Sequence, residues 1–392
     1  NYFMRTIVKP FRDRYNRGAA LPVGEYVYSS AYDQGEEWTS LDIETGYPQT
    51  KLFNGLNVYT AGPTNSVSVG VAAFGNSYNF LRNLRVEMGN TIVIDSSMDR
   101  FKTIKTQVNN LPLSLFPNTD NIIFSVYGTN PSQFDRIVVA SISLTYPSRF
   151  NFNNEKSFQF TLGASGSGNF IVIDNFNYGT ATPVLYSLND GKRYAGDIAV
   201  AGKVIFALPA STDPARKFIL VNEEISNITA ISNFTTRNFI NYALTANQGD
   251  YLIISNPGIY NDGNGVNYVD LYRQYRSSVA GGSFNTKVVS IDELTDQFAF
   301  GINKHPAAIR DFIRFADQQF LPKAKYVFII GRGISSSEYA SNTTDQTINK
   351  LDLVPTFGWP ASDMLLSCDH NKLVPLIPIG RLGVVNGTEV KY

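Results

Sequence analysis

The chain has 392 residues, of which 33 are Lys or Arg, 33 are Asp or Glu, two are His and one is Cys. This balance excludes the long-range positive field that attracts nucleic acid or anionic lipid, the single cysteine excludes an internal disulfide, and two histidines leave little for a zinc site. No apolar run approaches the roughly 18 residues of a membrane-spanning helix, so the sequence predicts neither a nucleic-acid partner nor a membrane span.

The length and the two ends of the chain indicate its organisation. A chain with 43% hydrophobic and 13% aromatic residues at this length is expected to form two or three domains with a large β content. It begins at Asn1 without an initiator Met or a signal-peptide pattern, and it ends at Tyr392 just past an apolar run. We therefore expect it to be part of a longer protein.

Residues 1–240 are expected to form an all-β sandwich region of jelly-roll type. Residues 1–55 have no clear period and are interpreted as edge strands and loops. From about residue 56 to 240 apolar and polar residues alternate, which is typical of half-buried antiparallel strands. The alternation is centred on Val69, Val86, Phe124, Ile142, Phe160 and Phe206. Whether the region holds one sandwich or two is left open, because pairing between distant strands leaves no local pattern.

Two turn signals lie within this β region. Asp190-Gly191 supplies hairpin chemistry, since type I′ turns need residues that tolerate positive φ. The Gly- and Ser-rich stretch 163–169 lacks the Lys-Ser/Thr of a phosphate-binding loop. We interpret that stretch as a flexible hairpin tip rather than a site.

Residues 241–392 are expected to form an α/β subdomain, because the pattern changes near residue 247. Continuous apolar runs predict strands at 251–255, 287–291, 326–330 and 376–380. Asn267 is the expected cap of one helix, and Asn303 is the expected cap of a second. The apolar face of the second helix carries Ile309, Phe312, Ile313, Ala316 and Phe320. This order predicts a parallel sheet of Rossmann type with right-handed crossovers.

The third predicted strand ends in Gly331-Arg332-Gly333. A dinucleotide-binding loop needs G-x-G-x-x-G opening directly into a helix, whereas the continuation ISSSEYASNTTDQT is polar and shows no helical pattern. We interpret the glycines as a turn at the carboxyl end of a strand, either part of a ligand crevice or an ordinary turn. A nucleotide-binding protein is accordingly the least favoured function.

Two short polar groups near the end of the chain could carry chemistry. In Cys368-Asp369-His370 a nucleophile lies beside a base, but working dyads usually take the base from a separate element, so we interpret the cysteine as a small buried hydrophobe. Asp363, Asp369 and Asn371 offer oxygen ligands of the kind that calcium prefers, although their spacing matches no EF-hand. A solvated turn is favoured, and Asp363 and Asp369 are kept as weak candidates for a structural calcium ion.

Two further residues belong to the second predicted helix. His305 is placed in its first turn, where the helix dipole disfavours a cation, and is interpreted as a neutral boundary residue. Arg310 follows Ile309 at the edge of the apolar face. We expect Arg310 to pair with a carboxylate and orient the helix rather than bind substrate.

Several stretches of residues 241–392, in this order, resemble the gingipain family of cysteine peptidases. They are GDYLIISNP, VVSIDELTDQFAFGINKHPAAIRDFI, YVFIIGRG, VPTFGWPASD and LIPIGRLGV, which include Pro-Thr, Ser-Asp and Ile-Gly-Arg elements. The preceding β region, with GEEW at 35–38, is similar to the part that comes before the catalytic module in the PorU-like branch of the family. Members of that branch are sortases of the type IX secretion system.

The resemblance implies a caspase-like α/β sheet that carries a Cys-His dyad. In the family the dyad comes from strand ends later than the Ile-Gly-Arg element, here Ile379-Gly380-Arg381, so we expect both residues beyond Tyr392. No catalytic residue is assigned within the chain, which is predicted to be incomplete and inactive alone. The family commonly has Asp where this chain has Arg332, which leaves any ligand or metal role of that turn in doubt. Some members bind calcium.

The resemblance also implies a biological role. Such sortases act at the bacterial outer-membrane surface, where they remove a C-terminal signal domain from secreted cargo and transfer the cargo to a lipopolysaccharide anchor. Protein substrates and other secretion components are the partners expected on this basis. The alternative is a non-enzymatic surface module, in which the β-sandwich binds a glycan or a partner protein and the α/β part is a degenerate scaffold.

Overall fold

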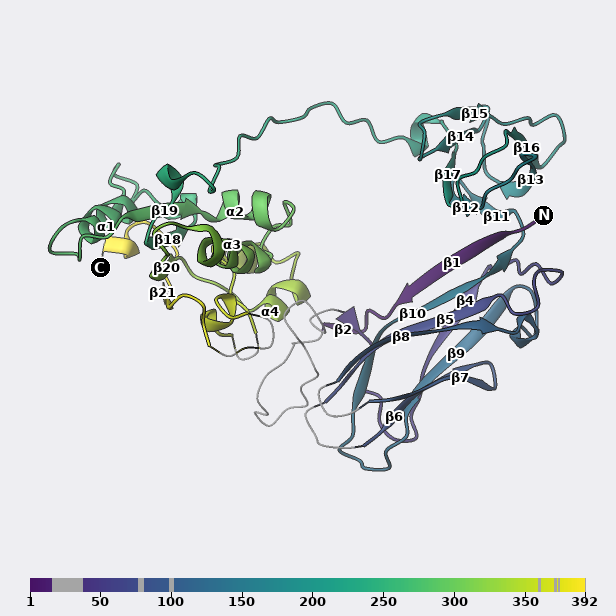
Figure 1. Cartoon of the computed structure of the whole chain (residues 1–392), viewed down its shortest axis with the longest axis horizontal. Coiled ribbons are helices and arrows are strands. Elements are labelled where there is room, and N and C mark those ends of the chain that lie inside the picture. Colours follow the sequence, from purple (N-terminus) through teal and green to yellow (C-terminus); the bar gives the residue numbers. More distant parts are fainter. Residues whose placement is uncertain are drawn as a thin grey trace. The chain divides into compact units, whose positions relative to one another are not determined.

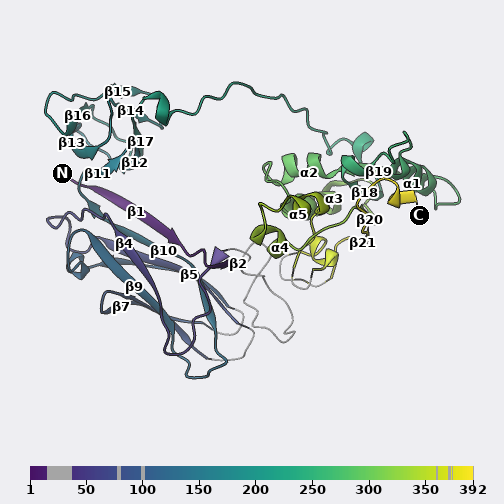
Figure 2. The ribbon, with the colours of Figure 1, turned by 180° about the vertical axis from the view of Figure 1, so that it is seen from behind.

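The computed structural model describes residues 1–15, 38–76, 81–98, 102–358, 361–369, 372 and 374–391. The chain divides into two compact units, the first made of Asn1–Arg14 with Trp38–Thr235 and the second mainly of Thr236–Tyr392. Strands build the first unit, whereas helices surround a sheet in the second (Figures 1 and 2). Of the GEEW stretch at 35–38, only Trp38 lies within the described residues.

The first unit begins with a sandwich of two antiparallel four-stranded sheets. One sheet has the order β1 (Phe3–Pro10), β10 (Ile137–Ser148), β5 (Val67–Gly75) and β8 (Thr103–Leu111). The other has the order β4 (Gln49–Asn54), β9 (Asn121–Gly128), β6 (Asn83–Met88) and β7 (Thr91–Ser97). A short pair, β2 (Arg14–Tyr15) and β3 (Trp38–Thr39), accompanies them. The edge positions of β1 and β4 confirm the edge strands predicted in residues 1–55.

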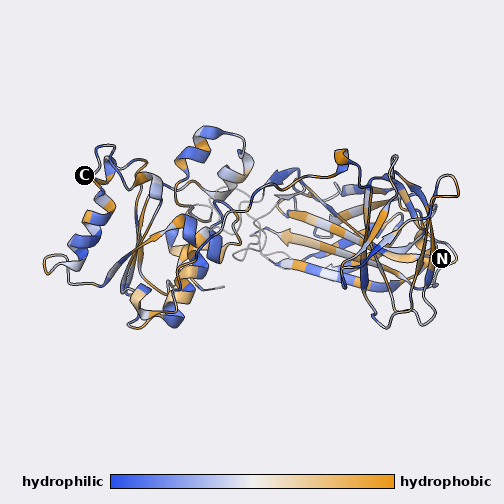
Figure 3. Cartoon of the chain, turned by 90° about the horizontal axis from the view of Figure 1, so that it is seen from above, coloured by the Kyte–Doolittle hydropathy of each residue, from blue (hydrophilic) through white to orange (hydrophobic). Residues whose placement is uncertain are grey.

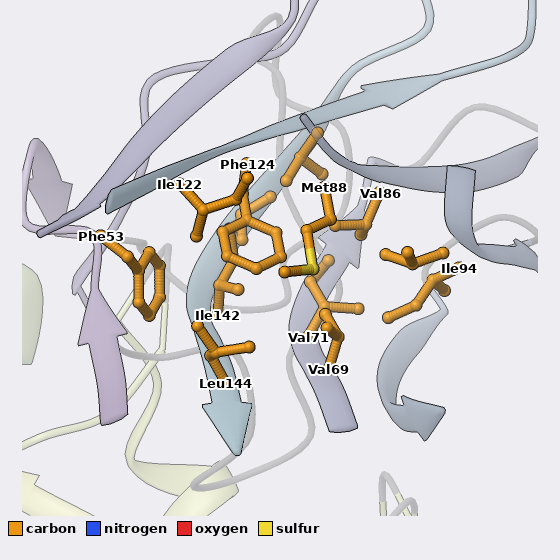
Figure 4. Close-up of a cluster of buried hydrophobic side chains, with 14 of the residues drawn as sticks. Phe53, Val69, Val71, Val86, Met88, Ile94, Ile122, Phe124, Ile142 and Leu144 are labelled. Atoms are coloured by element: carbon orange, nitrogen blue, oxygen red, sulfur yellow. The ribbon is translucent and has the colours of Figure 1, made fainter. Parts of the chain in front are cut away.

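The core of this sandwich is made by the inward-facing residues of the alternating pattern. Val71 of β5 pairs with Ile142 of β10, and both are buried, as are Phe124 and Met88 of the opposite sheet. Figure 4 shows these side chains pointing toward one another between the two sheets. Because successive strand residues point to opposite faces, every second residue enters this core.

A second, smaller sandwich follows in the first unit. Its sheets have the orders β11 (Asn151–Glu155), β13 (Asn169–Phe176), β16 (Lys203–Leu208), and β12 (Ser157–Leu162), β17 (Arg216–Val221), β14 (Val184–Ser187), β15 (Arg193–Ala195). It has an aromatic core of its own, in which the Phe152 and Phe158 rings stack with centroids 3.9 Å apart. Phe3 of β1 joins this core. The described residues of the β region therefore form two sandwiches with separate cores.

The two turn predictions have different outcomes. Gly191 has a φ of 70° in the connection between β14 and β15, which confirms the predicted hairpin. The stretch 163–169 is not a hairpin tip, because it joins β12 and β13, which lie in different sheets. Sequence alternation could not reveal this, since it does not show which strands pair.

The second unit is an α/β sheet, as predicted. Its four strands are all parallel, in the order β19 (Thr286–Ser290), β18 (Tyr251–Ser255), β20 (Tyr326–Ile330) and β21 (Ile379–Leu382). The helices are α1 (Tyr268–Ser277), α2 (Ile291–Phe298), α3 (Ala307–Gln319), α4 (Ser336–Ser341) and α5 (Gln346–Leu351). Leu252 and Ile254 pack with α2 and α3, whereas Ile253 packs with Val269 of α1. The sheet is thus covered on both faces, which explains its uninterrupted apolar strands.

Single-turn 3₁₀ helices complete both units. In the first unit they are Leu113–Leu115 and Ile225–Asn227. In the second they are Thr245–Asn247, Pro257–Ile259, Asp363–Leu366 and Glu389–Lys391. In Figure 3, hydrophobic and hydrophilic residues alternate around the helices and along the strands, as expected for elements with one covered side. Within the described residues, no helix has the length and apolarity to span a bilayer.

Several helix boundaries differ from the sequence predictions. Asn267 caps α1 by accepting a hydrogen bond from the Asp270 N–H at 2.9 Å, as predicted. However, α3 begins after Pro306 rather than at Asn303, although the residues of its predicted apolar face are all buried. The helix α2, capped by Ser290, was not predicted, and neither were the short helices α4 and α5 in the stretch interpreted as unhelical.

The position of the last strand also needs correction. The apolar run 376–380 predicts a strand there, but β21 covers Ile379–Leu382. Ser367 explains the difference: its hydroxyl donates to the Ile377 carbonyl and accepts from the Ile377 N–H. Both polar groups of Ile377 are therefore used by a side chain before the strand begins.

Candidate functional site

The carboxyl ends of the four parallel strands form the candidate site. In open α/β sheets the loops at this edge build the ligand crevice, because helices cover both faces of the sheet. Here the edge is marked by Ser255, Ser290, Ile330 and Leu382, the last residues of their strands. The first three are aligned in register across β19, β18 and β20.

The turn Gly331-Arg332-Gly333 is the point where three segments meet. The Gly331 N–H donates to the Leu382 carbonyl at 2.9 Å, and the Arg332 N–H donates to the Val384 carbonyl at 2.8 Å. The Arg332 carbonyl in turn accepts from the N–H groups of Leu353 and Val354, both at 3.0 Å. The main chain of Arg332 is therefore fixed by three hydrogen bonds while its side chain is exposed.

Both glycines are required by the close approach of these segments. Gly331 has a φ of 141°, which side chains rarely allow, and a Cβ atom there would lie 2.9 Å from the Val354 side chain. A Cβ atom on Gly333 would lie 2.6 Å from the Val354 carbonyl oxygen. The glycines thus serve a tightly packed turn at a strand end, as interpreted from the sequence, and not a phosphate cradle.

Arg381 of β21 holds this edge together. Its guanidinium donates to both carboxylate oxygens of Asp363, with Nε to Oδ2 at 2.8 Å and Nη2 to Oδ1 at 2.7 Å. It also donates to the carbonyls of Gly331 at 2.7 Å, Val354 at 2.8 Å and Pro355 at 3.1 Å. All five N–H groups of the guanidinium are used. One side chain therefore fixes the GRG turn, the 354–355 segment and the 3₁₀ helix Asp363–Leu366.

Thr356 completes this polar cluster. Its hydroxyl donates to Asp363 Oδ1 at 2.9 Å. The side chains of Arg381 and Asp363 are only 12% and 22% exposed, so their ion pair is largely withdrawn from water. Such a pair, with both carboxylate oxygens and all guanidinium protons satisfied, gives geometric precision. Thr356, Asp363 and Arg381 belong to the Pro-Thr, Ser-Asp and Ile-Gly-Arg elements of the sequence.

A second buried carboxylate, Asp352, supports the same edge. Its Oδ1 accepts from the Ile334 N–H at 3.0 Å, just past the GRG turn, and its carbonyl accepts from Lys304 Nζ. Asp352 is 1% exposed. Burial raises the pKa of its carboxyl above the ordinary value, while the Ile334 N–H and the positive charges of Lys304 and Arg381 act in the opposite direction.

The loop after β18 joins the same arrangement. Asn256 accepts from the Gly258 N–H at 2.8 Å and donates through Nδ2 to the Leu353 carbonyl at 3.0 Å. Beside it, the hydroxyl of Ser255 is buried and has no hydrogen-bond partner among the described residues. Hydrogen bonds therefore connect the loops that follow β18, β20 and β21.

Cys368 does not have the surroundings of a nucleophile. The residue is 4% exposed, and burial raises the pKa of its thiol, the opposite of what a reactive thiolate needs. Its main chain pairs with Pro375, and its carbonyl accepts from Arg314 at 3.3 Å. The interpretation as a small buried hydrophobe is confirmed. His370 and Asn371 lie outside the described residues.

The two weak calcium candidates both have cationic partners. Asp363 is held by Arg381 as described above, and Asp369 lies 3.3 Å from Lys372 Nζ and 3.8 Å from Arg314. Within the described ranges, no group of three or more His, Cys, Asp or Glu residues is placed to hold a metal ion. A calcium ion here stays a prediction.

The other two sequence candidates serve α3. His305 precedes the helix rather than lying in its first turn, and its Nδ1 accepts from the Ala307 N–H at 3.1 Å. His305 therefore accepts a hydrogen bond from a main-chain N–H at the start of the helix. Arg310 is 5% exposed and pairs with the Asp311 carboxylate at 2.8 Å, as the predicted carboxylate pairing requires.

The role of Arg381 was not predicted from the residues. Its partners lie 18 positions away at Asp363 and 50 positions away at Gly331, and such distant contacts leave no periodic signal. The only available signal was the order of the Pro-Thr, Ser-Asp and Ile-Gly-Arg elements.

Comparisons with known proteins agree with this architecture. Residues 244–392 match the model of peptidase family C25, the gingipain family. The whole chain is similar to dimeric latent PorU from Porphyromonas gingivalis, with a TM-score of 0.52 and 11% sequence identity. This match covers 100% of the chain and 37% of the PorU structure. The resemblance to the gingipain family and the fold class predicted from the sequence are confirmed.

One further structure and one negative result complete the comparison. A family two carbohydrate esterase from Cellvibrio japonicus aligns over 91% of this chain and 90% of its own, at 10% identity. Its TM-score of 0.19 does not indicate a shared fold. No curated protein matches the chain in sequence.

Proposed function

We propose that this chain is part of a gingipain-type cysteine peptidase, and that the peptidase is a type IX secretion sortase that cleaves C-terminal signal domains from exported cargo. The observation that carries the proposal is that the residues matching peptidase family C25 coincide with the parallel sheet whose carboxyl edge Arg381 fixes. Protein substrates at the bacterial cell surface and other secretion components are the partners that this role requires.

The proposed reaction uses a thiolate and an imidazole supplied by residues that follow Tyr392. The thiolate attacks the carbonyl carbon of a peptide bond, and the imidazole gives a proton to the departing amine. Water or an amine acceptor then releases the acyl group, which gives hydrolysis or transfer. The part of this chain is to hold the sheet edge, since catalytic groups on neighbouring strands need a rigid support to stay aligned.

The burial of Cys368 supports placing the nucleophile elsewhere. A thiol in apolar surroundings is mostly protonated near pH 7 and is shielded from a peptide substrate. His305 is engaged at the start of α3. Both residues are therefore assigned structural roles.

The test is a peptidase assay on the full natural gene product and on residues 1–392 alone. We expect the full product to cleave a cargo protein at its C-terminal signal domain, and residues 1–392 to be inactive. Cys368→Ala in the full product should leave the rate within about twofold, because the change removes only a buried thiol. Loss of activity in a folded Cys368→Ala protein would contradict the proposal. An inactive full product that still binds the bacterial surface would instead favour the non-enzymatic module.

A further inference from the structure

A cavity of about 480 Å³ lies in the first unit, on the smaller sandwich, and falls within the roughly 300–1,000 Å³ range of small-ligand sites. It is formed where the start of the chain meets the beginning of β13 and the end of β16. Its lining residues are Asn1, Tyr2, Phe150, Leu162, Ser167, Gly168, Asn169, Phe170, Ile171, Ala207 and Leu208. Four of them belong to or directly follow the Gly- and Ser-rich stretch 163–169.

The lining combines aromatic rings with amide and hydroxyl groups. Among the described residues that form the wall, none has a charged side chain. A charged ligand finds no side chain of opposite charge in this wall, which makes its binding costly once water is displaced. The wall therefore suits an uncharged ligand that has both apolar faces and hydrogen-bonding groups.

The Gly- and Ser-rich stretch is held in place rather than free. Arg216 is 6% exposed and donates to the Gly163 carbonyl through Nε at 3.1 Å, and to Asn169 Oδ1 through Nη2 at 2.6 Å. Ser165 donates to the Gly168 carbonyl at 2.6 Å, and its main chain pairs with Ser211. These bonds give the cavity a preformed wall.

Two amide side chains in the wall have a fixed orientation. Asn169 Oδ1 accepts from the buried Arg216, so its Nδ2 group is the donor left for a ligand. Asn1 donates through Nδ2 to the Phe170 carbonyl at 2.9 Å, so its Oδ1 is the acceptor left for a ligand. The cavity thus offers a donor and an acceptor, with the exposed Ser167 hydroxyl able to serve as either.

Aromatic rings supply the apolar part of the wall. Phe170 is 61% exposed. Contact between its ring and a ligand would remove apolar surface from water, which lowers the free energy. Tyr2 is stacked on Tyr59 with centroids 5.3 Å apart and an interplanar angle of 16°, which holds its ring in one orientation. A flat ligand face lined with C–H groups could stack on such rings.

We propose that this cavity binds a neutral saccharide. A pyranose ring has apolar C–H faces that stack on aromatic rings, and its equatorial hydroxyl groups both donate and accept hydrogen bonds. Phe170 and Tyr2 contact the sugar faces, while Asn169 Nδ2, Asn1 Oδ1 and Ser167 contact the hydroxyl groups. This site lies outside the unit that matches the peptidase family, so it adds a binding activity independent of the proposed reaction.

The test is titration of the chain with three neutral disaccharides: cellobiose, lactose and N,N′-diacetylchitobiose. Saturation-transfer NMR on the sugar and the side-chain amide signals of Asn residues in a ¹⁵N-labelled sample report binding at the cavity. We expect at least one disaccharide to bind saturably and to shift the Asn169 amide signal. Phe170→Ala, which removes an exposed ring, should weaken binding about tenfold.

Two matched variants separate recognition from folding. Asn169→Asp keeps an oxygen for Arg216 but removes the Nδ2 donor, so it should fold and bind about tenfold more weakly. Tyr47→Ala removes another exposed aromatic ring, 71% exposed and outside the cavity wall, and should bind like the parent. The proposal is overturned if no neutral disaccharide binds saturably up to tens of millimolar. It is also overturned if both cavity variants bind like the parent, or if a uronic-acid disaccharide binds more tightly than the neutral ones.

Discussion

The Arg381 side chain makes five hydrogen bonds within the candidate site. Its guanidinium connects one carboxylate and three main-chain carbonyls that belong to three segments, the GRG turn, residues 354–355 and the 3₁₀ helix Asp363–Leu366. Lysine could not replace it, because an ammonium group has three donors around a point charge and cannot contact both carboxylate oxygens in a planar fork. The arrangement depends on geometry as well as on charge.

We expect Arg381→Met to destabilise the second unit by about 3–5 kcal/mol, because it leaves Asp363 largely buried without its cation. Arg381→Lys should lower the free energy of unfolding by less, because lysine keeps the positive charge. It should still be clearly destabilising, because lysine lacks the planar pair of N–H donors that contacts both oxygens of Asp363. Hydrogen exchange at the amides of β20 and β21 measures the loss where it occurs. Arg332→Met, at an exposed arginine of the same edge, is the control and should stay within about 0.5 kcal/mol. An equal loss of stability in Arg381→Met and Arg332→Met would contradict the role of Arg381.

Asp352 gives the same edge a pH dependence. Burial raises the pKa of its carboxyl in the folded state above the ordinary value of 3.8. The folded state therefore binds this proton more readily than the unfolded state, and its contribution to stability falls as pH rises between the two pKa values. Asp352→Asn removes the titration and keeps an oxygen for the Ile334 N–H.

The expected result is that Asp352→Asn is at least as stable as the parent at pH 7. The difference in unfolding free energy should shrink as pH falls toward the ordinary aspartate pKa, below which the parent carboxyl is mostly protonated in both states. Urea unfolding of the two proteins between pH 4 and pH 7 provides the measurement. A parent protein that gains stability over the variant as pH rises would show that the carboxylate is favoured by its neighbours instead.

The sequence predicts the role of a residue only where its contacts lie within a few positions along the chain. The Asn267 cap and the burial of Cys368 follow from adjacent residues and from residue type. The partners of Arg381 and of Asp352 come from other loops, so no spacing in the sequence could identify them. The family resemblance pointed to the segment but not to the contacts.

At the scale of elements, the GRG turn connects β20 to the loops of the neighbouring strand. Its two glycines have different constraints: Gly331 has a φ of 141°, and Gly333 faces the Val354 carbonyl. Gly383, just after β21, has open space around its Cβ position and no positive φ. These three glycines form a matched series within one edge of the sheet.

Gly331→Ala should destabilise the second unit by about 1–3 kcal/mol, because alanine rarely adopts that φ. Gly333→Ala should also be destabilising, since the facing atom belongs to the backbone and cannot rotate away. Gly383→Ala should be neutral or stabilising by up to about 1 kcal/mol, because it only restricts the unfolded chain. Thermal and urea unfolding of the three variants checks this order. If the Gly383→Ala protein is as unstable as the other two, the turn does not require glycine at 331 and 333 for the reasons given.

The elements that sequence patterns predicted best are long or fully apolar. The strands β18 and β20 and the helix α3 have patterns that their packing reproduces. The helix α2 has only eight residues, and of these Ile291 and Leu294 are buried, too few to show a period. The helices α4 and α5 have six residues each and depend on the capping of Ser335 and Asp345. Short capped helices of this kind fall below what hydrophobic periodicity can detect.

At the scale of the whole molecule, the two units have separate cores, and an extended segment leads from the smaller sandwich into the α/β sheet. Between the 3₁₀ helices Ile225–Asn227 and Thr245–Asn247 the chain forms no helix or strand. Large apolar side chains are exposed along it, with Ile231 at 70%, Phe234 at 87% and Phe239 at 56%. The sequence pattern changes near residue 247, just after this segment.

Limited chymotrypsin digestion of the folded chain should therefore cleave first after Phe234 or Phe239. Proteases act preferentially on exposed, extended chain that has few main-chain hydrogen bonds. We expect two resistant fragments, the first with the circular dichroism of β-sheet and the second with the mixed signal of helices and strands. Mass spectrometry identifies the cut sites, and a first cut within a β-sandwich or within the α/β sheet would contradict the division into two units.

In the function proposed above, the α/β unit belongs to the sheet of a cysteine peptidase whose reactive thiol lies outside residues 1–392. The most direct measurement is to treat the full natural gene product with a peptidyl acyloxymethyl ketone, which alkylates active-site thiols, and to map the modified cysteine by mass spectrometry. The account predicts a single modified cysteine that follows Tyr392, with Cys368 unmodified in the folded protein. Rapid modification of Cys368 would contradict it.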